Sequence, residues 1–106
     1  MRGDVLKNHL ELLALTALKA GPGHGYSIIR AIRDRSDGEF KLLEGSLYPA
    51  LHRLERDSLV TSSWSNVAGR KRRVYELSRK GRAALEQRER DWRRFEHAMN
   101  LVLAGQ

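Results

Sequence analysis

The sequence predicts a mainly α-helical fold that also contains a two-stranded β-hairpin. Apolar residues recur every three or four positions through most of the 106 residues, and this is the spacing of amphipathic helices. Alternation with a period of two is confined to residues 60–77, where β-branched and aromatic residues are frequent. A chain of this length is expected to form one compact unit, and no repeat or low-complexity tract divides it.

The first two predicted helices cover residues 4–20 and 24–36. Asp4 is placed to cap the start of the first, which carries a leucine and alanine stripe along one face. Gly21-Pro22-Gly23 is expected to end it, because proline has no amide hydrogen and glycine accepts turn conformations. The apolar face of the second helix is formed by Tyr26, Ile28, Ile29 and Ile32.

A third helix is expected over about 46–58, after an apolar connecting segment at 39–44 that has room for a very short strand. The Ser46 hydroxyl is placed to cap its first turn, with Pro49 close behind. Leucines at intervals of four and three give this helix one apolar stripe. The side chains that point away from the stripe, to varying degrees, are Ser46, Tyr48, Pro49, His52, Arg53 and Arg56.

Residues 60–77 are predicted to form an antiparallel hairpin with its turn at Asn66-Val67-Ala68-Gly69. Four consecutive basic residues, Arg70-Lys71-Arg72-Arg73, follow the turn and are placed at the hairpin tip. Because alternate strand residues face opposite sides, two or three of these cations are expected to face one row of phosphates. Tyr26 and Tyr75 lie in apolar faces and are expected to be core aromatics.

The last helix is predicted over 79–106, with Ser78 as its N-cap. Its large apolar side chains recur at intervals of three and four, as in a coiled-coil seam, and Arg88 interrupts the series. So many large apolar groups on an arm beyond a small domain require a partner, and a second copy of the chain is expected. The residues expected at this dimer contact are Leu85, Trp92, Phe95, Met99 and Val102.

Positive charge is concentrated in one quarter of the chain. There are 20 Lys and Arg against 13 Asp and Glu, and residues 70–94 hold eleven of the cations and four of the anions. A localised basic region of this kind attracts polyanions such as nucleic acid. An exposed helix with mixed charge is the simpler interpretation of the helical part of this region, but it does not account for the cluster at 70–73.

Several function classes are disfavoured by composition. The chain has no cysteine, which excludes disulfides and thiolate sites and fits a cytoplasmic protein. The four histidines are scattered without metal-ligand spacing, so no metal or other cofactor is expected. No catalytic constellation is evident, and no apolar run is long enough to cross a membrane, so neither an enzyme nor a membrane partner is expected.

Three helices followed by a hairpin are the arrangement of a winged helix-turn-helix domain, here predicted over 1–78, with a dimerisation helix at 79–106. In that arrangement the third helix enters the major groove of double-stranded DNA and the hairpin, at 60–77, contacts the flanking backbone. The residues we expect at DNA are Ser46, Tyr48, Pro49, His52, Arg53, Arg70, Lys71 and Arg72.

Three segments of the chain resemble the PadR family of bacterial transcriptional regulators. They are the turn from Gly21 to Tyr26, the helix from Gly45 to Glu55 and the hairpin from Gly69 to Ser78. The resemblance implies a winged-helix homodimer that usually represses and that releases DNA on binding a small molecule. In having a single long helix after the hairpin, the chain resembles the short subfamily, whose members lack the larger C-terminal dimerisation domain of other members. Two departures are Ser58, where the family commonly has glycine, and Val74, where tyrosine is frequent.

A planar apolar effector is a further expectation. Some short members resemble this chain in placing a tryptophan on the dimer helix beside an interfacial cavity that accepts flat aromatic compounds. An aromatic face in a partly hydrated interface also gives shape-tolerant affinity, although a tryptophan of the dimer core is the simpler interpretation. The residues expected near such a ligand are Trp92, Phe95, Leu13 and Ala17.

Two other functions compete with a DNA-binding regulator. One is a basic helical adaptor that binds RNA or an anionic surface through residues 70–94 without duplex specificity. The other is a ligand sensor that uses Trp92 and does not bind DNA. The sequence leaves open the operator, the target genes, the effector and the sign of regulation.

Overall fold

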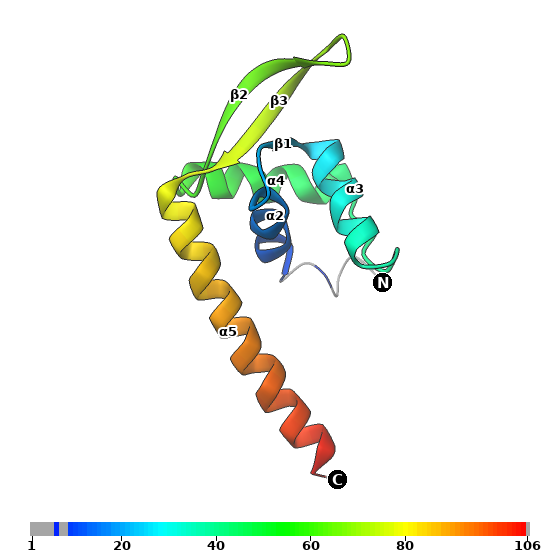
Figure 1. Cartoon of the computed structure of the whole chain (residues 1–106), viewed down its shortest axis with the longest axis vertical. Coiled ribbons are helices and arrows are strands. Elements are labelled where there is room, and N and C mark those ends of the chain that lie inside the picture. The colour runs from blue at the N-terminus through cyan, green and yellow to red at the C-terminus, as the bar shows by residue number, and fades with distance from the viewer. Residues whose placement is uncertain (1–5, 7–8, 106) are drawn as a thin grey trace.

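The computed structural model describes Leu6 and residues 9–105, and it places a helical domain between a projecting hairpin and a projecting helix (Figure 1). The longest axis measures 55 Å and the shortest 21 Å. The expected start of the first helix, with its Asp4 cap, lies outside the described residues. Along the part of the chain that the structure describes, no helix is both long enough and apolar enough to span a membrane.

Three helices form the core of the domain: α2 (Leu10–Leu18), α3 (Gly25–Arg35) and α4 (Glu44–Arg56). Each pair of these helices is in contact. The leucine stripe predicted for the third helix is fully buried, as are the leucine and alanine positions of α2 that face it. Burial of these apolar side chains is the main force that holds the three helices together. The least exposed residues of this core are Ala14, Leu15, Leu47, Ala50, Leu51 and Leu54.

Helix α4 begins two residues earlier than the sequence predicted. Leu43 is its N-cap residue, with extended backbone angles and no side-chain capping bond, so the expected role of Ser46 as the cap is wrong. Pro49 therefore lies inside the helix. Because proline has no backbone N–H, the carbonyl of Gly45 accepts no helical hydrogen bond from residue 49. Gly45 is exposed near the helix start, so water can take the place of that donor. The connecting segment at 39–43 packs inward through the buried Leu42, as expected, and the very short strand for which it had room is not formed.

The sheet has three strands rather than two. The hairpin strands β2 (Val60–Val67) and β3 (Arg70–Leu77) pair in the expected antiparallel manner. A two-residue strand, β1 (Gly23–His24), adds to the other edge of β3, opposite Val74 and Tyr75. Two residues are too few for alternation to be recognised in the sequence. Strand β1 thus joins the turn before α3 to the β2–β3 hairpin by backbone pairing. The β2–β3 hairpin will be called the wing.

Helix α5 (Arg79–Ala104) leaves the domain directly from the wing and is capped as predicted. The Ser78 hydroxyl accepts a hydrogen bond of 2.9 Å from the Gly81 backbone amide. Leu85 is only 2% exposed because it packs into the core of its own chain. It is therefore unavailable to a partner, and the expectation that it belongs to the dimer stripe is wrong. Arg88 still contacts Glu11 of α2, and the C-terminal part of α5 then extends away from the other helices (Figure 1).

The two tyrosines expected in the core have different environments. Tyr75, on strand β3 of the wing, is fully buried in the core, as predicted. Tyr26 is 48% exposed at the start of α3, and the Arg30 guanidinium lies 5.5 Å from its ring centroid. The expectation of a core role for Tyr26 is wrong because the buried face of α3 is formed by Ile28 and Ile32.

Candidate functional site

A groove of about 330 Å³ lies between helix α4 and the wing. Strand β1, helix α4 and the two strands of the wing all contribute side chains to it, so three separate regions of the sequence meet there. The lining combines imidazole, aromatic and cationic groups, which are the types that contact phosphates and sugars of nucleic acids. The residues that line this groove, the wing groove, are His24, Tyr48, His52, Trp64, Lys71, Arg72, Arg73 and Tyr75.

Helix α4 presents an exposed ridge beside the wing groove. Ser46, Pro49, His52 and Arg53 are exposed because the leucine stripe fills the opposite side of the helix. Tyr48 is only partly exposed, and its hydroxyl packs against Gly25 at the start of α3. A Cβ atom on Gly25 would overlap that hydroxyl, so the glycine is needed for this close approach.

The basic residues of the wing differ in their position along β3 and in whether an acidic side chain of the same chain pairs with them. The turn is formed by Ala68 and Gly69, both with positive φ, so the cluster runs along β3 and only Arg70 and Lys71 lie next to the tip. Arg73 is directed inward, where its Nη2 lies 3.7 Å from Oε2 of Glu55 on α4. Its charge is thus partly neutralised within the chain.

Sequence reasoning did not identify Trp64 as part of this region. The indole is 58% exposed on β2, and the cationic ends of Lys71 and Arg73 each lie 5.4 Å from its ring centroid. Cations near an aromatic face are attracted by its quadrupole, so the indole favours the positions that the two cations take beside it. The alternation of β2 and β3 was the available signal, because it places Trp64 opposite Arg73.

Two titratable groups of the wing groove are perturbed. The pKa of His24 is lowered, first by burial and then by the charges of Arg72 and Arg30. The pKa of Tyr75 is raised, first by burial and then by the Glu55 carboxylate. Both groups are therefore neutral at pH 7, and the positive charge of the wing groove comes from the β3 cations.

A second hollow, of about 570 Å³, lies between α2 and α5. Its walls are mostly apolar and include Phe40 from the segment before α4. Trp92 stands at its edge, with the His9 ring 5.3 Å away in an edge-to-face contact and the Phe95 ring 5.8 Å away and stacked. We call this the Trp92 cavity; its lining residues are Leu6, His9, Leu12, Leu13, Thr16, Phe40, Glu89, Trp92 and Arg93.

Two of the four residues expected near a ligand line the Trp92 cavity. Leu13 and Trp92 are among its walls. Phe95 instead lines an adjoining hollow with Glu11 and Arg88, and Ala17 faces a separate small one near the turn after α2. The expectation that Ala17 neighbours Trp92 is therefore wrong. Leu12 and Phe40 were not anticipated, because the cavity forms only where α5 and the segment before α4 both pack beside α2.

The outer half of α5 leaves a row of large apolar side chains exposed. Trp92 is 39%, Phe95 53%, Met99 44% and Val102 69% exposed. Leu101 and Leu103 are exposed beside them. This row will be called the α5 stripe. Among the described residues, no group of three or more potential metal-binding side chains is found.

Comparison with known proteins agrees with this geometry. A family model described as the transcriptional regulator PadR-like family matches residues 14–87. An uncharacterised protein of Lysinibacillus sphaericus is 26% identical over 106 residues, covering 99% of this chain and 97% of that protein. Transcriptional regulator Rv3488 of Mycobacterium tuberculosis is 46% identical over 67 residues, which are 63% of this chain and 60% of that protein.

Solved structures are similar over nearly the whole chain. A transcriptional regulator from Clostridium thermocellum superposes with a TM-score of 0.84 at 26% identity, covering 92% of this chain and 96% of that one. A PadR family transcription regulator from Clostridium difficile R20291 superposes with a TM-score of 0.76 at 34% identity, covering 90% of this chain and 98% of that one. The likeness therefore includes the wing and most of the long final helix.

Proposed function

The chain belongs to the PadR-like family of transcriptional regulators, and from this premise we propose that it is a homodimeric repressor that binds a palindromic DNA operator and releases it on binding a planar apolar effector. The observation that carries the proposal is the wing groove, where the exposed ridge of α4 and the cations of the wing meet. We place this activity in the cytoplasm, on the chromosome.

The DNA contacts divide between the two elements. The ridge of α4 enters the major groove, where polar and cationic side chains reach base edges and phosphates. Cations of the wing lie on the flanking backbone and supply affinity that is independent of sequence. From α4 the residues proposed at DNA are Tyr48 and the ridge residues Ser46, Pro49, His52 and Arg53. From the wing they are Arg70, Lys71 and Arg72.

The homodimer is supported by the α5 stripe. A monomer seldom leaves a row of large apolar side chains in water, and a second copy offers a surface of the same composition. Two-fold pairing through α5 places two copies of α4 on one face of the assembly, about 34 Å apart if they read successive major grooves. A palindromic operator follows from that symmetry.

The effector proposal rests on the Trp92 cavity, which borders the α5 stripe. Its walls are mainly apolar and its rim is aromatic, which suits a flat hydrophobic molecule. A ligand there contacts both α2 and α5, and it changes DNA affinity only if it binds the free and the DNA-bound forms of the dimer unequally.

The first test is binding to a labelled fragment from the protein's own upstream region, titrated against salt with unrelated competitor DNA. A competitor-resistant shift by a dimer is expected. Tyr48→Ala should weaken specific binding more than nonspecific binding, whereas Lys71→Ala should weaken both and reduce the salt slope by about 0.9. Equal effects of both substitutions on any polyanion would favour the adaptor, and Trp92 quenching by aromatic compounds without duplex binding would favour the ligand sensor.

A further inference from the structure

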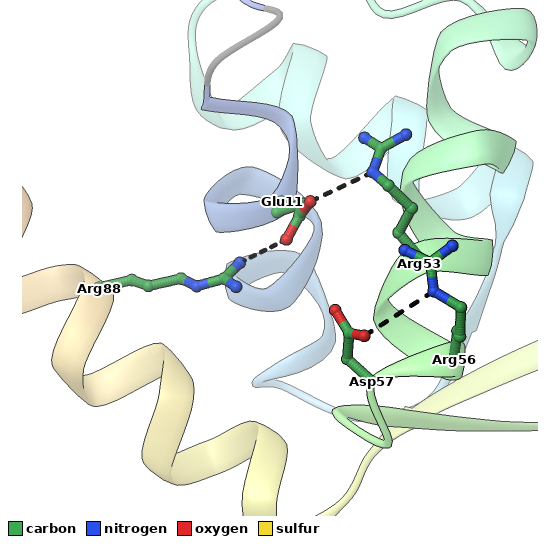
Figure 2. Close-up of polar contacts among 5 residues, drawn as sticks. All are labelled: Glu11, Arg53, Arg56, Asp57 and Arg88. Carbon is green, nitrogen blue, oxygen red and sulfur yellow. Dashed lines mark hydrogen bonds and ion pairs between the residues drawn. The ribbon is translucent and has the colours of Figure 1, made fainter.

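One carboxylate of α2 connects three helices. Oε1 of Glu11 lies 2.9 Å from Nη1 of Arg88 on α5, and Oε2 lies 3.4 Å from Nε of Arg53 on α4. Figure 2 shows both guanidinium groups reaching the same carboxylate from opposite sides. Arg53 belongs to the exposed ridge of α4, so an acidic group of the domain holds one of the cations that face DNA.

We propose that Glu11 is a positioning residue that competes with a DNA phosphate for Arg53 and thereby limits the affinity of the regulator. The inference rests on the proposed DNA-binding function and adds an acidic residue on α2 to it. Arg88 fixes the carboxylate in place, and Glu11 then draws the Arg53 guanidinium toward α2.

The two contacts of Glu11 differ in geometry and in surroundings. The contact with Arg88 is short and its partner is the less exposed of the two arginines, with a side chain that is 35% exposed against 44% for Arg53. The longer contact with Arg53 is the weaker ion pair, and partly exposed pairs of this kind contribute little stability. A phosphate can therefore replace Glu11 as the partner of Arg53, while Arg88 continues to balance the carboxylate.

Neighbouring charges on α4 are arranged differently. Arg56, one turn further along, lies 3.8 Å from its own neighbour Asp57, and both side chains are more than half exposed (Figure 2). That ion pair is formed between sequence neighbours at the end of α4, and the only link from Asp57 to α5 in the described structure is its backbone carbonyl, which accepts a hydrogen bond of 3.1 Å from Lys80. Glu11 is distinct because its two partners connect the ridge of α4 with α5 close to Trp92, and Glu11 and Arg88 line the hollow that adjoins the Trp92 cavity.

The test is a double-mutant cycle. Wild type, Glu11→Gln, Arg53→Gln and the double variant are titrated with the duplex that wild type binds and with a random duplex of equal length, over a series of salt concentrations. Glu86→Gln is the matched control, because it removes one negative charge from the exposed side of α5, and no ion pair is found for it in the described structure. Thermal unfolding and light scattering check that each variant is a folded dimer.

Glu11→Gln is expected to bind DNA about two- to fivefold more tightly, which is the scale of a partly exposed ion pair. Its salt slope should be steeper by up to about 0.9, as for one added phosphate contact. Both gains should be absent in the Arg53→Gln background and in Glu86→Gln. If the Gln variant does not fold, Glu11→Asp, whose shorter side chain cannot reach both arginines, should also bind more tightly than wild type.

Other outcomes overturn the inference. Unchanged or weaker binding by a folded Glu11→Gln dimer means that Glu11 does not compete for Arg53. An equal gain in the Arg53→Gln background means that the charge acts on DNA directly. Failure of the proposed function is distinguishable, because wild type would then show no preference between the two duplexes, whereas the cycle can still be measured on either of them.

Discussion

Individual residues of this protein take their roles from partners that are distant in the sequence. Arg53 and Arg73 have the same chemistry, and the sequence alone placed both in elements expected to contact DNA. In the structure Arg53 lies against Glu11 and Arg73 against Glu55, whereas no ion pair is found for Lys71 or Arg70 in the described part of the chain. The number of Lys and Arg residues in these elements therefore overestimates the positive charge that is free to interact with a phosphate.

Ser58 is the residue for which a substitution should increase stability. It follows α4 with φ of +63°, in a left-handed conformation that favours glycine. Hydrogen bonds from Ser58 N to Glu55 O and from Leu59 N to Leu54 O close the helix in the manner of a Schellman motif. Ser58→Gly should raise the free energy of unfolding by about 0.5–1 kcal/mol, because it relieves this strain.

Denaturant unfolding of wild type and Ser58→Gly measures that change. Ser58→Ala is the control, because alanine retains the Cβ atom and should be no more stable than serine. A Ser58→Gly protein that unfolds at a lower denaturant concentration than wild type would show that the strain is smaller than the entropy cost of glycine.

His24 should make stability depend on pH. Burial and the charges of Arg72 and Arg30 lower its pKa in the folded protein below the usual 6.5. The unfolded chain therefore binds the proton more readily, and the stability that neutral His24 provides is complete above pH 6.5 and falls as the pH decreases through the folded pKa. His24→Gln should unfold with a weaker pH dependence between pH 7.5 and 5 than wild type, as measured by urea titrations at each pH.

At the scale of elements, the apolar stripes determine where the helices form, and close contacts between elements determine how they are joined. The buried positions of α4 were predicted because leucines at intervals of three and four lie on one face. The start of the same helix was predicted two residues late, because Ser46 has the residue type of a cap while Leu43 has the backbone angles. Leu42 is buried just before the helix. Where a buried side chain holds the preceding segment in this way, the residue type at a candidate cap is a poor guide to where the helix begins.

The junction between α5 and the wing depends on Gly81. A Cβ atom there would overlap the backbone carbonyl oxygen of Leu59, so the first turn of α5 lies directly against the chain that enters β2. Gly81→Ala should lower the free energy of unfolding by about 1–3 kcal/mol through overpacking, although alanine is the better helix former.

Gly45→Ala is the matched control for Gly81→Ala. Gly45 lies in α4 with open space around its Cβ position. Alanine there should stabilise the protein by up to about 1 kcal/mol through helix propensity. Chemical denaturation compares the two variants. If both stabilise the protein, the contact between α5 and Leu59 adjusts without cost.

At the scale of the whole molecule, the wing and α5 extend in opposite directions from one helical domain (Figure 1). Cations gather along the wing, and large apolar side chains gather along the outer half of α5. The two surfaces are therefore suited to different partners, DNA for one and a second copy of the chain for the other.

Met99 tests the proposed assembly. It is 44% exposed in the α5 stripe, so a carboxylate at this position would be desolvated on dimerisation without an evident partner. Met99→Glu should raise the dimer dissociation constant at least about 30-fold, equivalent to ~2 kcal/mol, and weaken operator binding. Light scattering over a concentration series measures the dimer, and circular dichroism checks the fold.

His97→Glu is the control for Met99→Glu. It introduces the same charge on the opposite side of α5, and the dimer should remain intact. If Met99→Glu remains a dimer of unchanged affinity for DNA, the α5 stripe is not the contact between subunits.

The sequence by itself determined the order of the helices and the hairpin, the buried leucine stripe of α4, the Ser78 cap and the pairing of β2 with β3. These features depend on spacing along the chain, and that spacing is visible without a structure. The PadR-like family was also recognisable, because the motifs of the turn, α4 and the wing are contiguous segments.

Only the tertiary structure decided which surfaces these elements form together. The third strand β1, the inward position of Leu85, the walls of the Trp92 cavity and the position of Glu11 between two arginines all depend on contacts between residues far apart in the chain. Periodicity fixes which face of an element is apolar, but it does not fix which element covers that face. The covering element follows from packing the whole core at once.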